Sequence, residues 1–118
     1  MRKLPFDKVY VISLPSSTDR RAYIARHLPE AGIPTFEFHD AIGPDAEQVG
    51  RALREGRVKS FPPCFRCGEL DCGQEDCNNV LIPQQIATFL SHRELWRKVS
   101  AGDTCALVCE DDVVLHPW

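Results

Sequence analysis

The sequence predicts an α/β protein built around a parallel sheet. Short apolar runs of strand length alternate with longer segments of helical composition, and the first run, the helix after it and the second run form a βαβ unit. A chain of 118 residues has room for one hydrophobic core. We therefore expect one domain over residues 1–118, with a small cysteine-rich insertion at 60–80.

The predicted βαβ unit begins with a strand over residues 8–14. This run is β-branched and aromatic and stops before Pro15, which favours a strand buried on both faces. Polar residues 16–19 supply a turn and a helix N-cap. A helix over 20–28 follows, and Pro29 ends it.

The second predicted strand covers residues 35–38, where apolar and polar side chains alternate. Residues 39–45 are predicted to form a loop, because they contain Gly and Pro. A short helix is expected over 46–54. The segment Ser60-Phe61-Pro62-Pro63 is then expected to interrupt regular secondary structure before the cysteines.

The longest predicted helix begins at Pro83, a residue suited to a first helical turn, and its apolar side chains recur at helical spacing up to Gly102. Residues 104–109 are mostly apolar and predict a buried central strand. That strand delivers the carboxylates of residues 110–112 at its C-terminal end.

Charge and hydropathy exclude several functional classes. The net charge is −3, and residues 60–118 hold nine acidic and four basic groups, whereas a general nucleic-acid binder needs clustered Lys and Arg. No apolar run approaches the roughly 20 residues of a membrane span, and the run at 9–14 is too short for a signal peptide. We expect a cytoplasmic protein with reduced cysteines.

The acidic triplet at the end of the last strand is the first candidate site. Glu110 and Asp112 project to the same side of an extended segment and Asp111 to the other. Two carboxylates suit Mg²⁺ or Mn²⁺, which take oxygen ligands and keep positions for water and substrate phosphates. The alternative is a solvated acidic turn without a ligand.

The second candidate site is a C-x2-C-x4-C-x4-C segment. Four thiolates within fourteen residues can surround a tetrahedral Zn²⁺, as in a zinc knuckle, and the acidic surroundings favour a structural clip. Free or disulfide-bonded thiols and an iron–sulfur cluster are the alternatives. The four ligands are Cys64, Cys67, Cys72 and Cys77. Cys105 and Cys109 are too far apart along a strand to share a metal and are expected in the core.

Four segments, in chain order, carry a family resemblance. They are Val9–Leu14 with Asp19-Arg20-Arg21, Phe36–Gly43, Gln85–His92 with Trp96, and Val108–Val113. Together they resemble glycosyltransferase family 25, the lipopolysaccharide-type galactosyltransferases, and the last two are the most specific. The sequence departs from the family pattern at four positions, namely Ser13 for Asn, Gln85 for Glu, Ala87 for Gly and Thr88 for Cys.

The resemblance implies the incomplete, nucleotide-sugar-binding half of a Rossmann-like GT-A fold, a three-layer α/β/α arrangement. The triplet then serves as a DxD-type motif in which Glu110 and Asp112 hold Mn²⁺ or Mg²⁺ against a diphosphate. The residues implied in donor binding are Arg20, Arg21, Ser91, His92 and Asp111.

The implied reaction is transfer of a hexose such as galactose from a UDP-sugar to a glycan or lipopolysaccharide acceptor. The general base is expected beyond Trp118, because the chain stops six residues after Asp112. The isolated chain is therefore expected to be inactive or nearly so. The alternative function is a non-catalytic zinc-knuckle binding module on a degenerate transferase scaffold.

Overall fold

The computed structural model describes residues 3–70, 72–74, 77 and 81–116. The elements follow the order β1 (Lys8–Ser13), α1 (Thr18–Glu30), β2 (Glu37–Asp40), α2 (Glu47–Arg54), α3 (Pro83–Ser100) and β3 (Ala106–Glu110). The chain divides into two compact units. We call Met1–Ala41 with Ser91–Trp118 the sheet unit, and Ile42–Leu90 the cysteine unit.

The sheet unit is built on three parallel strands in the order β2-β1-β3. The pairing of β1 with β2 across α1 confirms the predicted βαβ unit. Five of the six residues of β1 are buried, and only Lys8 is exposed. The first strand is therefore the centre of the sheet, as its unbroken apolar composition predicts.

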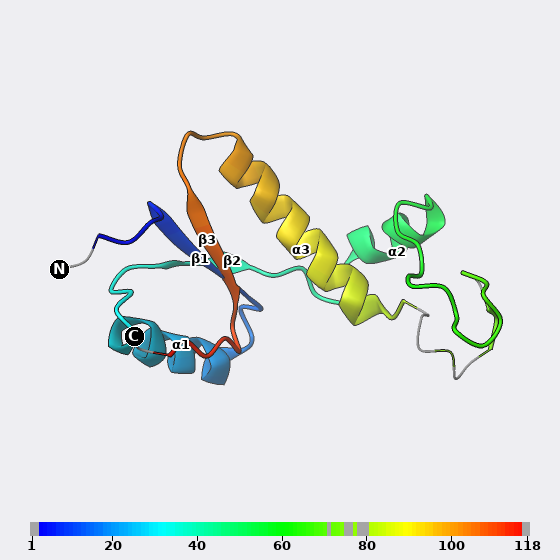
Figure 1. Cartoon of the computed structure of the whole chain (residues 1–118), viewed down its shortest axis with the longest axis horizontal. Helices are drawn as coiled ribbons and strands as arrows, with labels where there is room; N and C mark the ends of the chain where they lie inside the picture. The colour runs from blue at the N-terminus through cyan, green and yellow to red at the C-terminus, as the bar shows by residue number, and fades with distance from the viewer. Residues whose placement is uncertain (1–2, 71, 75–76, 78–80, 117–118) are drawn as a thin grey trace. The chain divides into compact units, whose positions relative to one another are not determined.

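Helices cover both faces of this sheet. Val9 and Val11 face α1 and pack in one core with its buried Ile24 and Leu28. Tyr10 and Ile12, on the opposite face, pack against Leu95 of α3. Figure 1 shows α1 and the C-terminal half of α3 on opposite sides of the strands. The three-layer α/β/α arrangement is confirmed.

The position of β3 corrects one prediction. Residues 104–109 were expected to form a buried central strand, but β3 is an edge of the described sheet and begins only at Ala106. Three of its five residues are half-buried because only β1 pairs with it. Cys109 is buried in the core as expected, whereas Cys105 precedes the strand and is exposed.

Several boundaries of the βαβ unit also differ from expectation: β1 ends at Ser13 rather than at residue 14, and α1 begins at Thr18 rather than at residue 20. β2 covers Glu37–Asp40 rather than 35–38, because pairing with β1 continues until Ser13 lies beside Asp40. α1 continues past Leu28 through Pro29 to Glu30. Pro29 is tolerated in the last turn, where the Ala31 N–H still bonds the His27 carbonyl at 2.9 Å.

The segment after β3 is held against α1. The Tyr23 hydroxyl donates to the Val113 carbonyl at 2.9 Å, and the Leu115 N–H donates to Nε2 of His27 at 2.8 Å. The Tyr23 and His27 rings stack with centroids 5.2 Å apart. These contacts fix the direction in which the chain leaves the acidic triplet.

The cysteine unit contains α2, the first half of α3 and the segment between them. Its apolar core joins the two helices and consists of Val49, Ala52, Ile86, Ala87 and Leu90. Among the helices of the described residues, none has the length and apolarity needed to cross a membrane.

Candidate functional site

The candidate site lies where the strands of the sheet unit end. The register pairs Ser13 with Asp40 and Ile12 with Glu110, so the carboxyl ends of β1, β2 and β3 meet at one edge. Ligands of open parallel sheets bind beyond this edge. The chain then turns sharply after β3, because the Val113 N–H bonds the Glu110 carbonyl at 3.2 Å.

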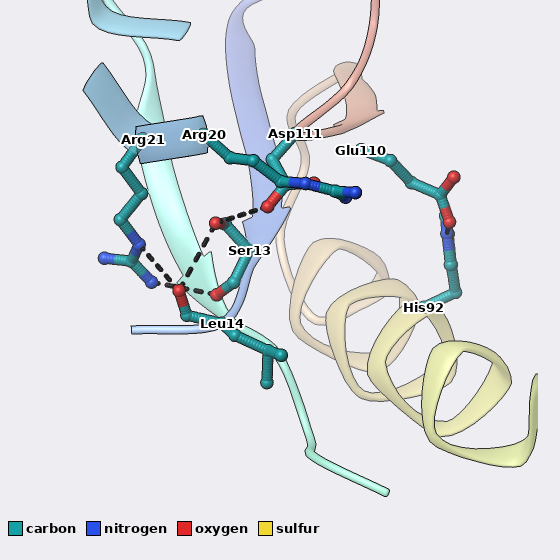
Figure 2. Close-up of polar contacts among 7 residues, drawn as sticks. All are labelled: Ser13, Leu14, Arg20, Arg21, His92, Glu110 and Asp111. Carbon is teal, nitrogen blue, oxygen red and sulfur yellow. Dashed lines mark hydrogen bonds and ion pairs between the residues drawn. The ribbon is translucent and has the colours of Figure 1, made fainter. Parts of the chain in front are cut away.

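Asp111 is the inward-facing member of the acidic triplet. Only 7% of the residue is exposed. The Ser13 hydroxyl donates to its Oδ2 at 2.7 Å, and Nη1 of Arg20 donates to its Oδ1 at 3.0 Å (Figure 2). Both carboxylate oxygens are therefore already bonded within the sheet unit.

Glu110 and Asp112 are the exposed members of the triplet. The Glu110 side chain points away from Asp111, toward α3, where its Oε1 lies 3.2 Å from Nε2 of His92 (Figure 2). Asp111 is thus buried while Glu110 is exposed, but residues 111 and 112 lie in a turn rather than in the extended segment that the sequence predicts. Among the described residues, neither Glu110 nor Asp112 belongs to a group of three or more Asp, Glu, Cys or His side chains close enough to hold a metal ion.

The two arginines expected near the donor take different positions. The Arg20 side chain is 61% exposed and reaches Asp111. The hydrogen bond with Asp111, followed by the charges of Asp111 and Asp112, raises the pKa of Arg20. Arg21 instead bonds the Ser13 carbonyl and Asp40, both at 2.8 Å, and lies over the Phe38 ring. It joins the ends of β1 and β2.

The serine-histidine pair at the end of the family-like helix motif is split between interior and surface. Ser91 is fully buried, whereas the His92 side chain is partly exposed and reaches Glu110. The His92 ring also lies 5.9 Å from the Trp96 ring, one helical turn later. Of the two, His92 is the residue that meets the acidic triplet.

Two polar residues of this edge were not predicted as site residues. The sequence marks Ser13 only as a departure from the family Asn, and Asp40 only as part of a predicted loop. Ser13 ends β1 beside Asp111 of the triplet, and Asp40 ends β2 beside Arg21. A polar residue closing a buried apolar run is the sequence signal that points to such a position.

Replacing Ser13 by alanine is expected to lower the free energy of unfolding by about 2 kcal/mol, because it removes a buried hydrogen bond to a carboxylate. Ser16→Ala, at an exposed serine of the next loop, is the matched control and is expected to change it by less than about 0.5 kcal/mol. Urea unfolding followed by circular dichroism measures both. Equal values for the two variants would show that the Ser13 contact contributes nothing.

The cysteine unit contains a second cluster of chemically active side chains. The sulfur atoms of Cys64, Cys72 and Cys77 all lie within 4.8 Å of one another. Cys64 and Cys77 are buried, and none of the six cysteines, all of which are among the described residues, forms a disulfide. Three convergent thiols are a donor set that could bind a metal ion.

The environment of this cluster favours a thiolate at Cys64. Hydrogen bonds from the backbone N–H groups of Cys67 and Arg66 lower the pKa of Cys64 to about 6. At Cys72 a backbone hydrogen bond from Gln74 lowers the pKa, but burial and the neighbouring thiols outweigh it and raise the value to about 12. Cys64 is thus the more acidic of these two thiols.

The sequence matches the family model described as glycosyltransferase family 25 (LPS biosynthesis protein) over residues 6–118. It is 33% identical to the lipooligosaccharide biosynthesis protein lic2B of Haemophilus influenzae over 107 residues, which cover 90% of this chain and 34% of the relative. It is 34% identical to the lacto-N-neotetraose biosynthesis glycosyltransferase LgtE of Neisseria meningitidis, covering 90% of this chain and 32% of that protein.

A more distant match is named inactive. The inactive glycosyltransferase 25 family member 3 of Mus musculus is 32% identical over 116 residues, or 96% of this chain and 18% of the relative. The chain spans about a third of the length of the two bacterial relatives.

Proposed function

The chain belongs to glycosyltransferase family 25, and from this membership we propose that it binds the nucleotide-sugar donor in a transferase of lipopolysaccharide synthesis. The donor is a UDP-sugar carrying a hexose such as galactose. The acceptor is a glycan or lipopolysaccharide, a class supported by the names of the bacterial relatives.

The observation that supports this proposal is the difference in burial between the central residue of the acidic triplet and the two residues beside it. Asp111 faces inward and is bonded to Ser13 and Arg20, whereas Glu110 and Asp112 remain exposed at the ligand-binding edge of the sheet. A turn that served only solubility would not need a buried central carboxylate. The arrangement instead fixes the turn and leaves two carboxylates for an external partner.

The exposed carboxylates have the donor chemistry that a hard divalent cation requires. Glu110 and Asp112 offer oxygen ligands, and their exposure leaves coordination positions for water and for the donor diphosphate. Mn²⁺ and Mg²⁺ fit this donor set better than softer metals. Glu110 and Asp112 would hold such an ion, which would supply a Lewis acid to neutralise negative charge on the leaving diphosphate.

The remaining residues of the edge act by orientation and charge. Arg20 lies beside the triplet with most of its side chain exposed, so it can contact a phosphate while one nitrogen stays on Asp111. His92 holds the Glu110 carboxylate from α3. Arg21 holds the ends of β1 and β2 together, and its contribution to the site is this positioning of the two strand ends.

The cysteine cluster requires a different cation. Thiolates prefer Zn²⁺ to Mn²⁺ or Mg²⁺, and the cluster belongs to the cysteine unit rather than to the sheet edge. We assign it a structural Zn²⁺, bound by Cys64, Cys67, Cys72 and Cys77, with no part in sugar transfer.

Calorimetric titration with UDP, with and without Mn²⁺, tests the transferase proposal. UDP binding is expected to require the ion, and Glu110→Gln and Asp112→Asn are each expected to weaken it at least about tenfold, which corresponds to about 1.4 kcal/mol. Asp103→Asn, at an exposed carboxylate before β3, is the matched control and is expected to leave binding unchanged.

Metal-independent binding, or binding unaffected by both variants, would contradict the donor site. A chain that binds zinc but no UDP would favour the non-catalytic zinc module instead.

A further inference from the structure

The described residues of the segment that joins α2 to α3 form no hydrophobic core of their own. Among the described residues from 55 to 82, none lies in a helix or strand, and Cys64 and Cys77 are the only buried ones, with 2% and 6% exposed. Phe61 and Phe65, the largest apolar side chains of the segment, are 78% and 82% exposed. Val58 and Leu81 pack at the edge of the core between α2 and α3, but they are only partly buried. The larger apolar side chains of the segment therefore do little to offset the entropy lost on ordering.

The cysteines lie where such a core would otherwise be. The three sulfur atoms of Cys64, Cys72 and Cys77 are mutually within 4.8 Å. Around a tetrahedral Zn²⁺ with bonds of about 2.3 Å, the sulfur atoms are about 3.8 Å apart. The sulfur atoms therefore need to approach one another by no more than about 1 Å to match this geometry. A disulfide would instead require two of them to lie about 2.0 Å apart.

Cys67 is exposed and lies outside the group of three mutually close sulfur atoms. Its thiol is nevertheless near enough to affect the pKa of both Cys64 and Cys72, so it is available as a fourth ligand. The turn between Cys64 and Cys67 is closed on both sides, because the Gly68 N–H donates to the Cys64 carbonyl at 2.7 Å and the Cys64 N–H donates to the Glu69 carbonyl at 2.9 Å. Gly68 has a φ of 76°, which a residue with a side chain rarely adopts.

We propose that a single Zn²⁺ held by Cys64, Cys67, Cys72 and Cys77 takes the place of a hydrophobic core in the described part of residues 55–82, so that this part folds only when the ion is bound. The inference rests on the zinc assigned to the cluster and adds the consequence for folding. Metal binding and folding become one equilibrium, because the four ligands converge only in the folded segment. The sheet unit has two apolar cores of its own and does not depend on the ion.

The test measures zinc content and local folding in the same protein. The 118-residue chain is purified without added zinc, and native mass spectrometry is expected to find one zinc per chain. Chelation is then expected to raise hydrogen exchange in peptides from 55–82 at least about tenfold, while peptides from β1 and α1 keep their protection. Protection of the sheet unit shows that the loss is local.

Matched cysteine variants identify the ligands. Cys64→Ser and Cys77→Ser are expected to retain less than about a tenth of an equivalent of zinc and to show the same local loss of protection. Cys67→Ser is expected to lose zinc at a lower chelator concentration than the unmodified chain. Cys105→Ser, at an exposed cysteine outside the cluster, is expected to keep the full equivalent.

The outcomes separate the zinc assignment from the folding inference. Zinc below about a tenth of an equivalent in the unmodified chain, or iron with visible absorbance in its place, overturns both. One equivalent of zinc whose removal leaves exchange in 55–82 unchanged overturns the folding inference alone. Neither readout depends on UDP, so the donor-site proposal is tested independently.

Discussion

Replacement of Asp111 by alanine is expected to lower the free energy of unfolding by about 3 kcal/mol. The substitution removes a charged acceptor and leaves the buried Ser13 hydroxyl without its main partner. Loss of the Arg20 pair adds little, because that side chain is 61% exposed and water replaces the contact. Chemical denaturation of the purified variant gives the value.

Asp112→Ala is the matched control for Asp111→Ala. It removes the adjacent carboxylate, which is exposed, so stability is expected to change by less than about 0.5 kcal/mol. The two neighbours should therefore have opposite profiles, with stability lost at Asp111 and metal-dependent UDP binding lost at Asp112. A double-mutant cycle with Ser13→Ala should give a coupling energy near the Ser13 effect itself. Additive effects would show that the two side chains do not interact.

Replacement of Leu95 by alanine is expected to cost about 3 kcal/mol of stability. Leu95 is fully buried and packs on the sheet face formed by Tyr10 and Ile12. Truncation of such a side chain removes its burial energy and leaves a cavity. Because Leu95 lies three residues after His92, a looser α3 should also weaken the contact between His92 and Glu110.

Arg97→Ala provides the comparison for Leu95→Ala on the same helix. Arg97 is exposed and alanine is the best helix former, so its replacement is expected to change stability by less than about 0.5 kcal/mol. Thermal unfolding followed by circular dichroism compares the variants. If the Leu95→Ala and Arg97→Ala proteins unfolded at the same temperature, α3 would not be anchored through Leu95.

The sequence was sufficient where local composition decides the structure. The apolar run of β1, the polar turn after it and the apolar spacing of α3 predicted elements that are present. The burial of β1 also followed from its composition, because strands covered by helices on both faces are apolar throughout.

Local composition failed where a long-range partner decides. The apolar run of β3 reads as a central strand, but its place at the edge depends on which strands pair with it. Likewise, the contact between Ser13 and Asp111 joins residues 98 positions apart and depends on strand register. The two added residues of β2 have the same origin, since pairing with β1 extends the strand beyond its alternating pattern.

The cysteine segment shows a third relation between sequence and structure. Spacing alone indicated four metal ligands, and the structure brings three of their sulfur atoms within 4.8 Å of one another, while Cys67 is exposed and outside this group. Spacing could not indicate that Cys64 and Cys77 are the only buried residues among those described from 55 to 82. The burial of a side chain depends on how the surrounding residues fold around it, which spacing along the chain does not specify.

The alignment of β3 beside β1 has a consequence for insertions and deletions. Successive side chains of a strand point to opposite faces, so a one-residue slip would send Asp111 outward and turn a neighbouring carboxylate toward Ser13. A single codon gained or lost within Ala106–Glu110 should therefore be far more damaging than one gained or lost in the preceding loop.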